Sequence, residues 1–193
     1  MRTFKPNLRK MATIVACLAA TTSFASCDKT NGVEDDYNKE TQINSPIVSH
    51  YWEYWLYSDV SGIYYYFDYV FKPDGTFFYV IRSSLDCFAT VHKGDYRVQN
   101  NTISIKNRKK SPQFNYDEKG YFKPPWTRYE EIAAIIEASK TVTFTNATDL
   151  SDINELTFSL STSTQELTEY ETQLLHITDA KGDERTFRKV KKI

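Results

Sequence analysis

A short loop between two long alternating runs fixes one hairpin, and with it much of what this chain can fold into. In SGIYYYFDYVFKPDGTFFYVIRS, residues 61–83, Pro73-Asp74-Gly75 has the composition of a tight loop, because proline presets φ and glycine tolerates the left-handed conformation of a bulge. Lys72 then pairs with Thr76. Counting outward in steps of two places an unbroken apolar and aromatic series on one face: Ile63, Tyr65, Phe67, Tyr69, Phe71, Phe77, Tyr79 and Ile81. The other face is mixed and carries Asp68, which we predict to be solvated.

A second hairpin gives an independent test of the same pattern. In GDYRVQNNTISIKN, residues 94–107, Asn100-Asn101 suits a two-residue type I′ turn. This turn produces two apolar cross-strand pairs, Val98 with Ile103 and Tyr96 with Ile105. Two separate turn assignments therefore each leave a consistent apolar face, which indicates antiparallel β-structure.

Short strands and turns continue to the C-terminus with one interruption. Further strands are predicted at 51–57, 141–145, 155–161, 166–171, 173–178 and 184–190. Residues 107–140 form an insertion that ends in the one predicted helix, 129–140, with an isoleucine stripe at Ile132, Ile135 and Ile136. The whole pattern is typical of an all-β meander, sandwich or barrel.

The N-terminus predicts export and a lipid anchor. Residues 1–10 are basic, and residues 11–20 are apolar but shorter than the roughly 20 residues that span a bilayer, which is the plan of a secretory signal peptide. Phe24-Ala25-Ser26-Cys27 resembles a bacterial lipobox, in which Cys27 is lipidated and becomes the new N-terminus. A similar pattern ends at Cys17, but cleavage there leaves an apolar run of only a few residues, so we reject it.

These signals divide the chain into a signal peptide at 1–26, a flexible polar tether at 27–46 and a folded domain at 47–193. Acyl chains on Cys27 would hold the protein on a membrane. Acidic residues 34–36 are either a solvated run or resemble the surface-export signal of gut-type Bacteroidetes. We therefore predict an outer-membrane lipoprotein of the cell envelope, periplasmic or surface-exposed.

Composition excludes several classes of function. Four of the 24 basic residues and none of the 25 acidic residues lie in 1–26, so the mature chain carries a net charge of −5, which argues against a nucleic-acid partner. Cys87 is left alone, so neither an intramolecular disulfide nor a cysteine zinc site is expected. His50, His92 and His176 are predicted at the surface or rim without metal-ligand spacing. We predict no catalytic residues, no cofactor and no enzyme activity; strand parity also places Cys87 and His92 on opposite faces.

Several segments together resemble a known domain. These are an early tryptophan strand, the F-K-P-D-G-T-F hairpin at 71–77, G-D-Y-R-V-Q-N-N-T-I-S-I at 94–105, E-L-T-F-S-L at 155–160 and T-F-R-K-V at 186–190. They resemble the lipocalin-like, or calycin-like, domain of secreted Bacteroidetes lipoproteins. The resemblance implies an up-and-down antiparallel meander closed into a barrel of about eight strands. It brings no catalytic residues with it.

Two functions follow as alternatives. In the first, the barrel binds a small apolar or amphipathic molecule or a glycan, with candidate ligand-binding residues Tyr65, Phe67, Tyr69, Tyr79, Tyr96 and Trp126. In the second, a filled barrel acts as a non-enzymatic structural or protein-interaction module. A cavity of a few hundred Å³ inside the barrel would favour the first. A filled interior with an exposed apolar patch would favour the second.

Overall fold

A computed structural model describes residues 44–117, 127–147, 154–165 and 168–192. The chain divides into two units, residues 1–34 and 35–193, and the described residues all lie in the second. The predicted lipidation site Cys27 and candidate Trp126 lie outside the described residues. Within them, no helix is both long and apolar enough to cross a bilayer.

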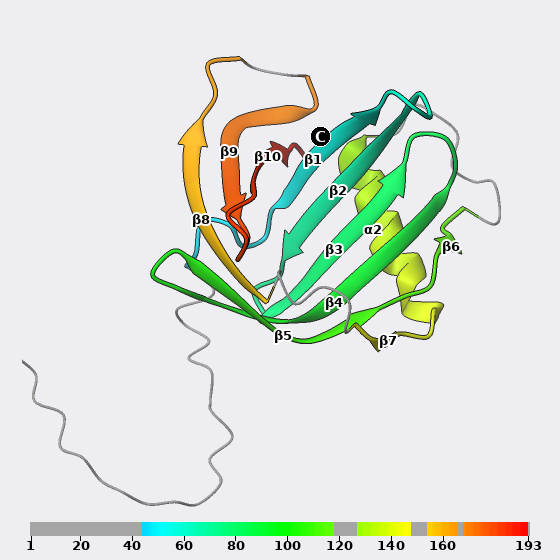
Figure 1. The fold of residues 1–193 in the computed structure, drawn as a ribbon, viewed down its shortest axis with the longest axis horizontal. Helices are drawn as coiled ribbons and strands as arrows, with labels where there is room; N and C mark the ends of the chain where they lie inside the picture. The colour runs from blue at the N-terminus through cyan, green and yellow to red at the C-terminus, as the bar shows by residue number, and fades with distance from the viewer. Residues whose placement is uncertain (1–43, 118–126, 148–153, 166–167, 193) are drawn as a thin grey trace, which may run out of the picture. The chain divides into compact units, whose positions relative to one another are not determined.

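Eight antiparallel strands form a closed ring, as the sequence predicted (Figure 1). Around the ring the order is β4-β3-β2-β1-β10-β9-β8-β5, and β5 pairs back to β4. The bounds of these strands are β1 (Tyr51–Ser58), β2 (Ile63–Phe71), β3 (Thr76–Ser83), β4 (Phe88–Gln99), β5 (Thr102–Lys110), β8 (Glu155–Thr162), β9 (Tyr170–Thr178) and β10 (Glu184–Val190). Short β6 (Phe114–Asn115) pairs with β4, and β7 (Thr145–Asn146) pairs with β5.

The ring is not a regular barrel, because neighbouring strands pair over very different lengths. β1 and β2 pair along eight residues, whereas β1 and β10 share the two pairs Trp52–Lys189 and Glu53–Arg188. β5 and β8 share three pairs. The ring therefore consists of a broad sheet, β1–β5, and a narrower one, β8–β10, joined by the short β1–β10 and β5–β8 pairings.

Both predicted hairpins are confirmed. Phe71 pairs with Phe77 across the Pro73-Asp74-Gly75 loop, and Gly75 has the left-handed φ of 82° that the loop requires. Asn100 and Asn101 have φ values of 48° and 63°, as a type I′ turn demands, and Val98 pairs with Ile103. The alternation of the sequence thus places the aromatic series inside the ring.

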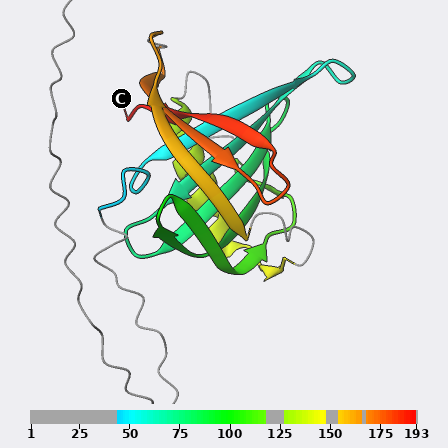
Figure 2. The ribbon, with the colours of Figure 1, turned by 60° about the vertical axis from the view of Figure 1, so that its left-hand side comes forward.

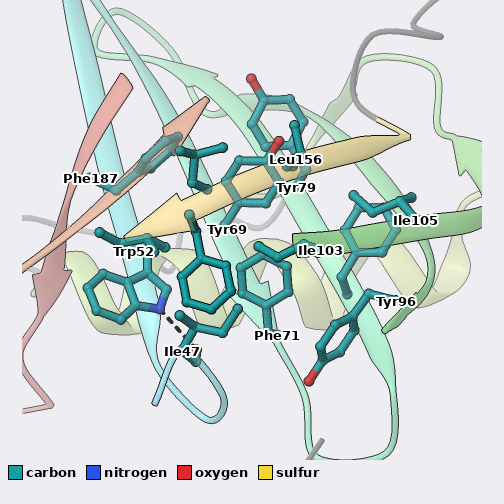
Figure 3. Close-up of a cluster of buried hydrophobic side chains, with 14 of the residues drawn as sticks. Ile47, Trp52, Tyr69, Phe71, Tyr79, Tyr96, Ile103, Ile105, Leu156 and Phe187 are labelled. Atoms are coloured by element: carbon teal, nitrogen blue, oxygen red, sulfur yellow. Dashed lines mark hydrogen bonds between the residues drawn. The ribbon is translucent and has the colours of Figure 1, made fainter. Parts of the chain in front are cut away.

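The interior is a packed core (Figure 3). Trp52 is fully buried, and its indole Nε1 donates a hydrogen bond to the carbonyl oxygen of Ile47 at 3.0 Å. Tyr69 stacks on Tyr79 with ring centroids 4.6 Å apart, and Phe187 meets the Tyr69 ring edge-on at 5.3 Å. Such ring pairs add to the hydrophobic stabilisation of the core.

The helix α2 (Arg128–Ala138) covers the outer face of the broad sheet and confirms the predicted helix (Figure 1). It begins with a capping box: the Thr127 hydroxyl accepts from the backbone N–H of Glu130, and the Glu130 carboxylate accepts from the N–H of Thr127. Its isoleucine stripe packs on the sheet in a second apolar cluster, which includes Ile132, Ile135, Ile136, Val70, Val80 and Val91.

Two predicted strands are wrong. Residues 139–141 form a 3₁₀ turn after α2, and β7 spans only Thr145–Asn146, so the predicted strand 141–145 is not present. The strands predicted at 166–171 and 173–178 are a single strand, β9, which begins at Tyr170. Residues 166–167 lie outside the described residues.

Candidate functional site

The predicted ligand-binding residues of the ring contribute to its packed core rather than lining an open cup. Tyr69, Tyr79 and Tyr96 are at most 6% exposed, and Phe67 packs against the same cluster. Tyr65 lies near the start of β2, close to the β1–β2 turn, and is 38% exposed. Burial raises the pKa of Tyr79 to about 12, because the ionised phenol would lose its hydration.

A cavity inside the ring is very small. It measures about 10 Å³ and is lined by Tyr69, Leu156, Ile177, Asp179, Asp183, Arg185 and Phe187. A cavity needs roughly 10–15 Å³ to hold one water molecule. This part of the interior therefore has no room for an organic ligand.

A larger hollow lies where β4 is bulged. The register between β4 and β5 shifts between Lys93 and Asp95, and Gly94 sits at the shift. A Cβ at Gly94 would come within 2.6 Å of the backbone oxygen of Lys106 and 3.0 Å of the Phe77 ring. Only glycine fits here without displacement of the backbone, and bulges of this kind often occur beside functional sites.

We call this hollow the bulge groove. Its volume is about 660 Å³, within the range of roughly 300–1,000 Å³ that is usual for small-molecule sites. It is lined by Thr76, Phe77, Phe78, Lys93, Gly94, Asp95, Asn107, Arg108, Lys109 and Asn146. The groove thus combines aromatic surface with amide and cationic groups.

Two like charges face each other in this groove. Lys93 and Lys109 are directly paired across β4 and β5, an arrangement that costs stability. The Lys93 ammonium lies 3.8 Å from the centroid of the Phe144 ring, and Lys72 lies 4.6 Å from that of Phe78. Aromatic faces stabilise these cations in part but do not neutralise their charge.

The acids close to the groove already accept hydrogen bonds. Asp95 accepts one from Asn107 Nδ2 at 2.7 Å. Asp74, in the adjacent loop, accepts from the Thr76 hydroxyl at 2.6 Å and from its backbone N–H at 2.9 Å. Arg108 adds a third, mostly buried cation to the lining, so positive charge dominates the groove.

A second polar cluster lies beneath α2, and its side chains are largely enclosed. Arg82 of β3 has a fully buried side chain and donates to three carboxylates. Its Nε lies 3.1 Å from Asp68 Oδ2 and its Nη1 lies 3.0 Å from Glu131 Oε2, while its Nη2 bonds Glu53. Glu131 also accepts from the Tyr116 hydroxyl at 2.7 Å. The cluster thus ties α2 to the broad sheet.

The prediction that Asp68 is solvated is wrong. Its outward parity is correct, but α2 covers that face, and the side chain is fully buried. Its Oδ1 is buried without a hydrogen-bond partner among the described residues. Desolvation by burial raises the pKa of Asp68 to about 8. The positive charge of Arg82 opposes this rise, whereas the nearby negative charges of Glu53 and Glu131 add to it.

The histidines are spread over the ring. His92 was predicted at the surface or rim but is fully buried, 5.7 Å from Tyr79 between ring centroids. Cys87 packs on the helix side of the sheet, so the predicted opposite placement of Cys87 and His92 is correct. His176 lies between Ser161 and Thr186, with its ring nitrogens 2.7 Å and 3.0 Å from their hydroxyls. Among the described residues no three metal-ligating side chains converge.

The bulge groove was not predicted from the sequence. Its signal was Gly94 within a strand, since an isolated glycine in a strand indicates a bulge or a close backbone approach. The Lys93–Lys109 pair depends on the register beyond that bulge, which the turn at Asn100-Asn101 alone does not give.

Comparisons with known proteins add no assignment: no family model matches the chain, and no curated protein is similar to it.

Proposed function

We propose that this protein is a membrane-anchored envelope lipoprotein that binds a small amphipathic anion in the bulge groove. The observation that carries the proposal is the Lys93–Lys109 pair beside the ring of Phe78, in a hollow of about 660 Å³. The ligand class is an apolar or aromatic body with a carboxylate, sulfate or phosphate group.

The charge pattern favours an anion. Two lysines held opposite each other repel, and an anion between them relieves this repulsion while gaining two charge-assisted hydrogen bonds. The Phe78 ring is paired with Lys93 and lines the groove on the same face as the two lysines, where an apolar body can pack. The ligand would therefore bind on the outer surface of the ring and not inside it.

The groove is suited to binding rather than catalysis. Its lining consists mainly of aromatic, amide and cationic groups, which hold and orient a ligand. Its one carboxylate, Asp95, accepts a hydrogen bond from Asn107. Export and anchoring rest on the sequence 1–27, with Cys27 as the proposed lipidation site.

Paired fluorescent probes test the proposal. 1-Anilinonaphthalene-8-sulfonate carries an aromatic body with an anionic group, and N-phenyl-1-naphthylamine has a similar body without the charge. We expect K93Q/K109Q to weaken sulfonate binding about 10-fold and to leave binding of the neutral probe nearly unchanged. Lys181→Gln, in the exposed β9–β10 turn, is the matched control. Equal sulfonate affinity in wild type and K93Q/K109Q would contradict the proposal.

A further inference from the structure

The exposed large hydrophobic side chains of the described residues gather at one end of the broad sheet. They belong to the β1–β2 hairpin and to the neighbouring β3–β4 connection: Leu56, Tyr57, Val60, Tyr64, Tyr65, Leu85 and Phe88. Val60, at the hairpin tip, is 100% exposed, and Leu85 is 72% exposed. Contiguous apolar surface of this kind marks interaction sites. We call it the apolar end.

Both faces of the β1–β2 hairpin are apolar at this end. Tyr57 pairs with Tyr64 on one face, with ring centroids 4.9 Å apart. Leu56 pairs with Tyr65 on the other. Figure 2 shows the hairpin projecting beyond the rest of the ring. A ribbon with one solvated face normally carries polar side chains there, so two apolar faces indicate that a partner covers them.

The same hairpin has an open strand edge. All of β1, from Tyr51 to Ser58, pairs with β2 on one side. On the other side β10 pairs with Trp52 and Glu53, and its Phe187 ring packs on Tyr54. Residues 54–58 have no paired strand on that side among the described residues. An open edge offers a row of backbone donors and acceptors to another strand.

The tip of this end carries acidic side chains. Asp59 and Asp86 are exposed beside the apolar side chains, and residues 56–65 and 83–88 contain no lysine or arginine. Nearer the base of the hairpin, the Arg188 guanidinium lies 4.7 Å from the centroid of the Trp55 ring. A partner with basic side chains beside an apolar strand complements this surface, whereas an anionic lipid surface does not.

We propose that an extended segment of another protein adds to the sheet along residues 54–58 of β1. The segment has apolar side chains at two successive positions, one facing the Leu56 side and the next the Tyr57 side of the sheet, and a lysine or arginine that reaches Asp59. Backbone hydrogen bonds supply affinity in this mode of recognition, and the alternate side chains supply specificity. This site is separate from the bulge groove, so the two proposals stand or fall independently.

Selection from a phage-displayed library of random peptides tests the inference. The probe protein is the full chain carrying Cys27→Ser, which removes the lipidation site. We expect the enriched peptides to carry apolar side chains at successive positions and to contain lysine or arginine. Added peptide should slow amide hydrogen exchange in residues 54–58. Leu56→Lys, which places a charge on the edge, should weaken binding about 10-fold. Thr162→Lys, which places the same charge on an exposed position of β8, should leave binding unchanged.

Three results would overturn the inference. One is the absence of enriched peptides, or protection that falls elsewhere in the chain. A second is a dimer, detected by light scattering and abolished by Leu56→Lys, because the occupant of the edge would then be a second copy. A third is protection of residues 54–58 by phosphatidylglycerol vesicles in the absence of peptide. If Leu56→Lys fails to fold, amide hydrogen exchange of the Cys27→Ser chain with and without peptide still shows whether the peptide protects residues 54–58.

Discussion

Arg82 Nε donates to Asp68 Oδ2 at 3.1 Å, and neither side chain has any exposed surface. Asp68 is one of three carboxylates, with Glu53 and Glu131, that bond to the Arg82 guanidinium beneath α2. The Arg82 guanidinium also lies 4.4 Å from the centroid of the Tyr66 ring. Arg82, Asp68 and Glu53 are removed from water and Glu131 is only 17% exposed, so the loss of any one charge leaves its partners poorly compensated. Docking of the helix should therefore be sensitive to each member of the cluster.

Asp68→Asn should flatten the pH dependence of stability. Burial raises the Asp68 pKa from 3.8 to about 8, so the folded chain binds a proton that the unfolded chain releases in this window. The free energy of unfolding of the wild type should therefore fall as pH rises from about 4 to about 8 and level off above that. Asparagine resembles the protonated acid, keeps an oxygen for Arg82 and removes this slope.

Urea unfolding at a series of pH values measures the effect. The Asp68→Asn variant should gain stability relative to the wild type as pH rises, and should differ least at acidic pH. Asp59→Asn, at an exposed acid in the β1–β2 turn, is the control and should follow the wild-type curve. A wild-type chain that becomes more stable between these pH values would contradict the assignment.

Arg82→Met should destabilise the fold strongly. It removes the cation and leaves Glu53, Asp68 and Glu131 close together without their shared donor. Loss of one partner from a buried ion pair costs roughly 3–5 kcal/mol, and partial protonation of the acids will offset some of this. Chemical denaturation measures the loss. An Arg82→Met chain as stable as the wild type at neutral pH would show that the cluster does not hold α2.

Gly94→Ala should both destabilise the chain and close the bulge groove. The added methyl group would lie 2.6 Å from the Lys106 carbonyl oxygen, so β4 and β5 must move apart, at a cost of roughly 1–3 kcal/mol. Sulfonate-probe affinity should fall with stability. Gly182→Ala is the comparison: it has no atom within 4 Å but a φ of +89°, so it should lose stability without losing probe affinity.

Phe71→Ala should show that the interior is a packed core. Phe71 is fully buried and stacks on Tyr69 with ring centroids 5.5 Å apart. Removal of a buried phenyl ring costs roughly 3–5 kcal/mol, because the surrounding side chains close the space only partly. Val60→Ala, at a fully exposed position, should change the unfolding free energy by less than about 0.5 kcal/mol. Similar losses at the two positions would contradict the description of the core.

Local chemistry made the hairpins predictable from the sequence. Gly75 and the Asn100-Asn101 pair each specify a turn, and each turn sets the register of its two strands. The aromatic interior follows from that register, whereas closure of the ring depends on the long-range pairings β1–β10 and β5–β8 and was expected only from the resemblance. The failed strand at 141–145 has β-branched residues, but it follows α2 directly and is held by the end of the helix.

The candidate sites were less predictable because they depend on what lies over each face of the sheet. The parity of Asp68 correctly pointed outward, yet α2 comes from more than fifty residues later in the chain and buries that face. Lys93 and Lys109 become neighbours only after the bulge at Gly94 shifts the register. Short-range patterns fix the hairpins, whereas long-range packing decides which polar groups are enclosed.

A nuclear magnetic resonance titration of the ¹⁵N-labelled protein with 1-anilinonaphthalene-8-sulfonate tests most directly where a ligand binds. If the ligand lies outside a filled ring, the backbone signals of Lys93, Gly94, Asn107 and Lys109 will shift in proportion to probe binding, and those of Tyr69 and Ile177 will stay in place. Shifts concentrated at Tyr69 and Ile177, with the signals of the groove unmoved, would show that the ligand enters the interior and that this account is wrong.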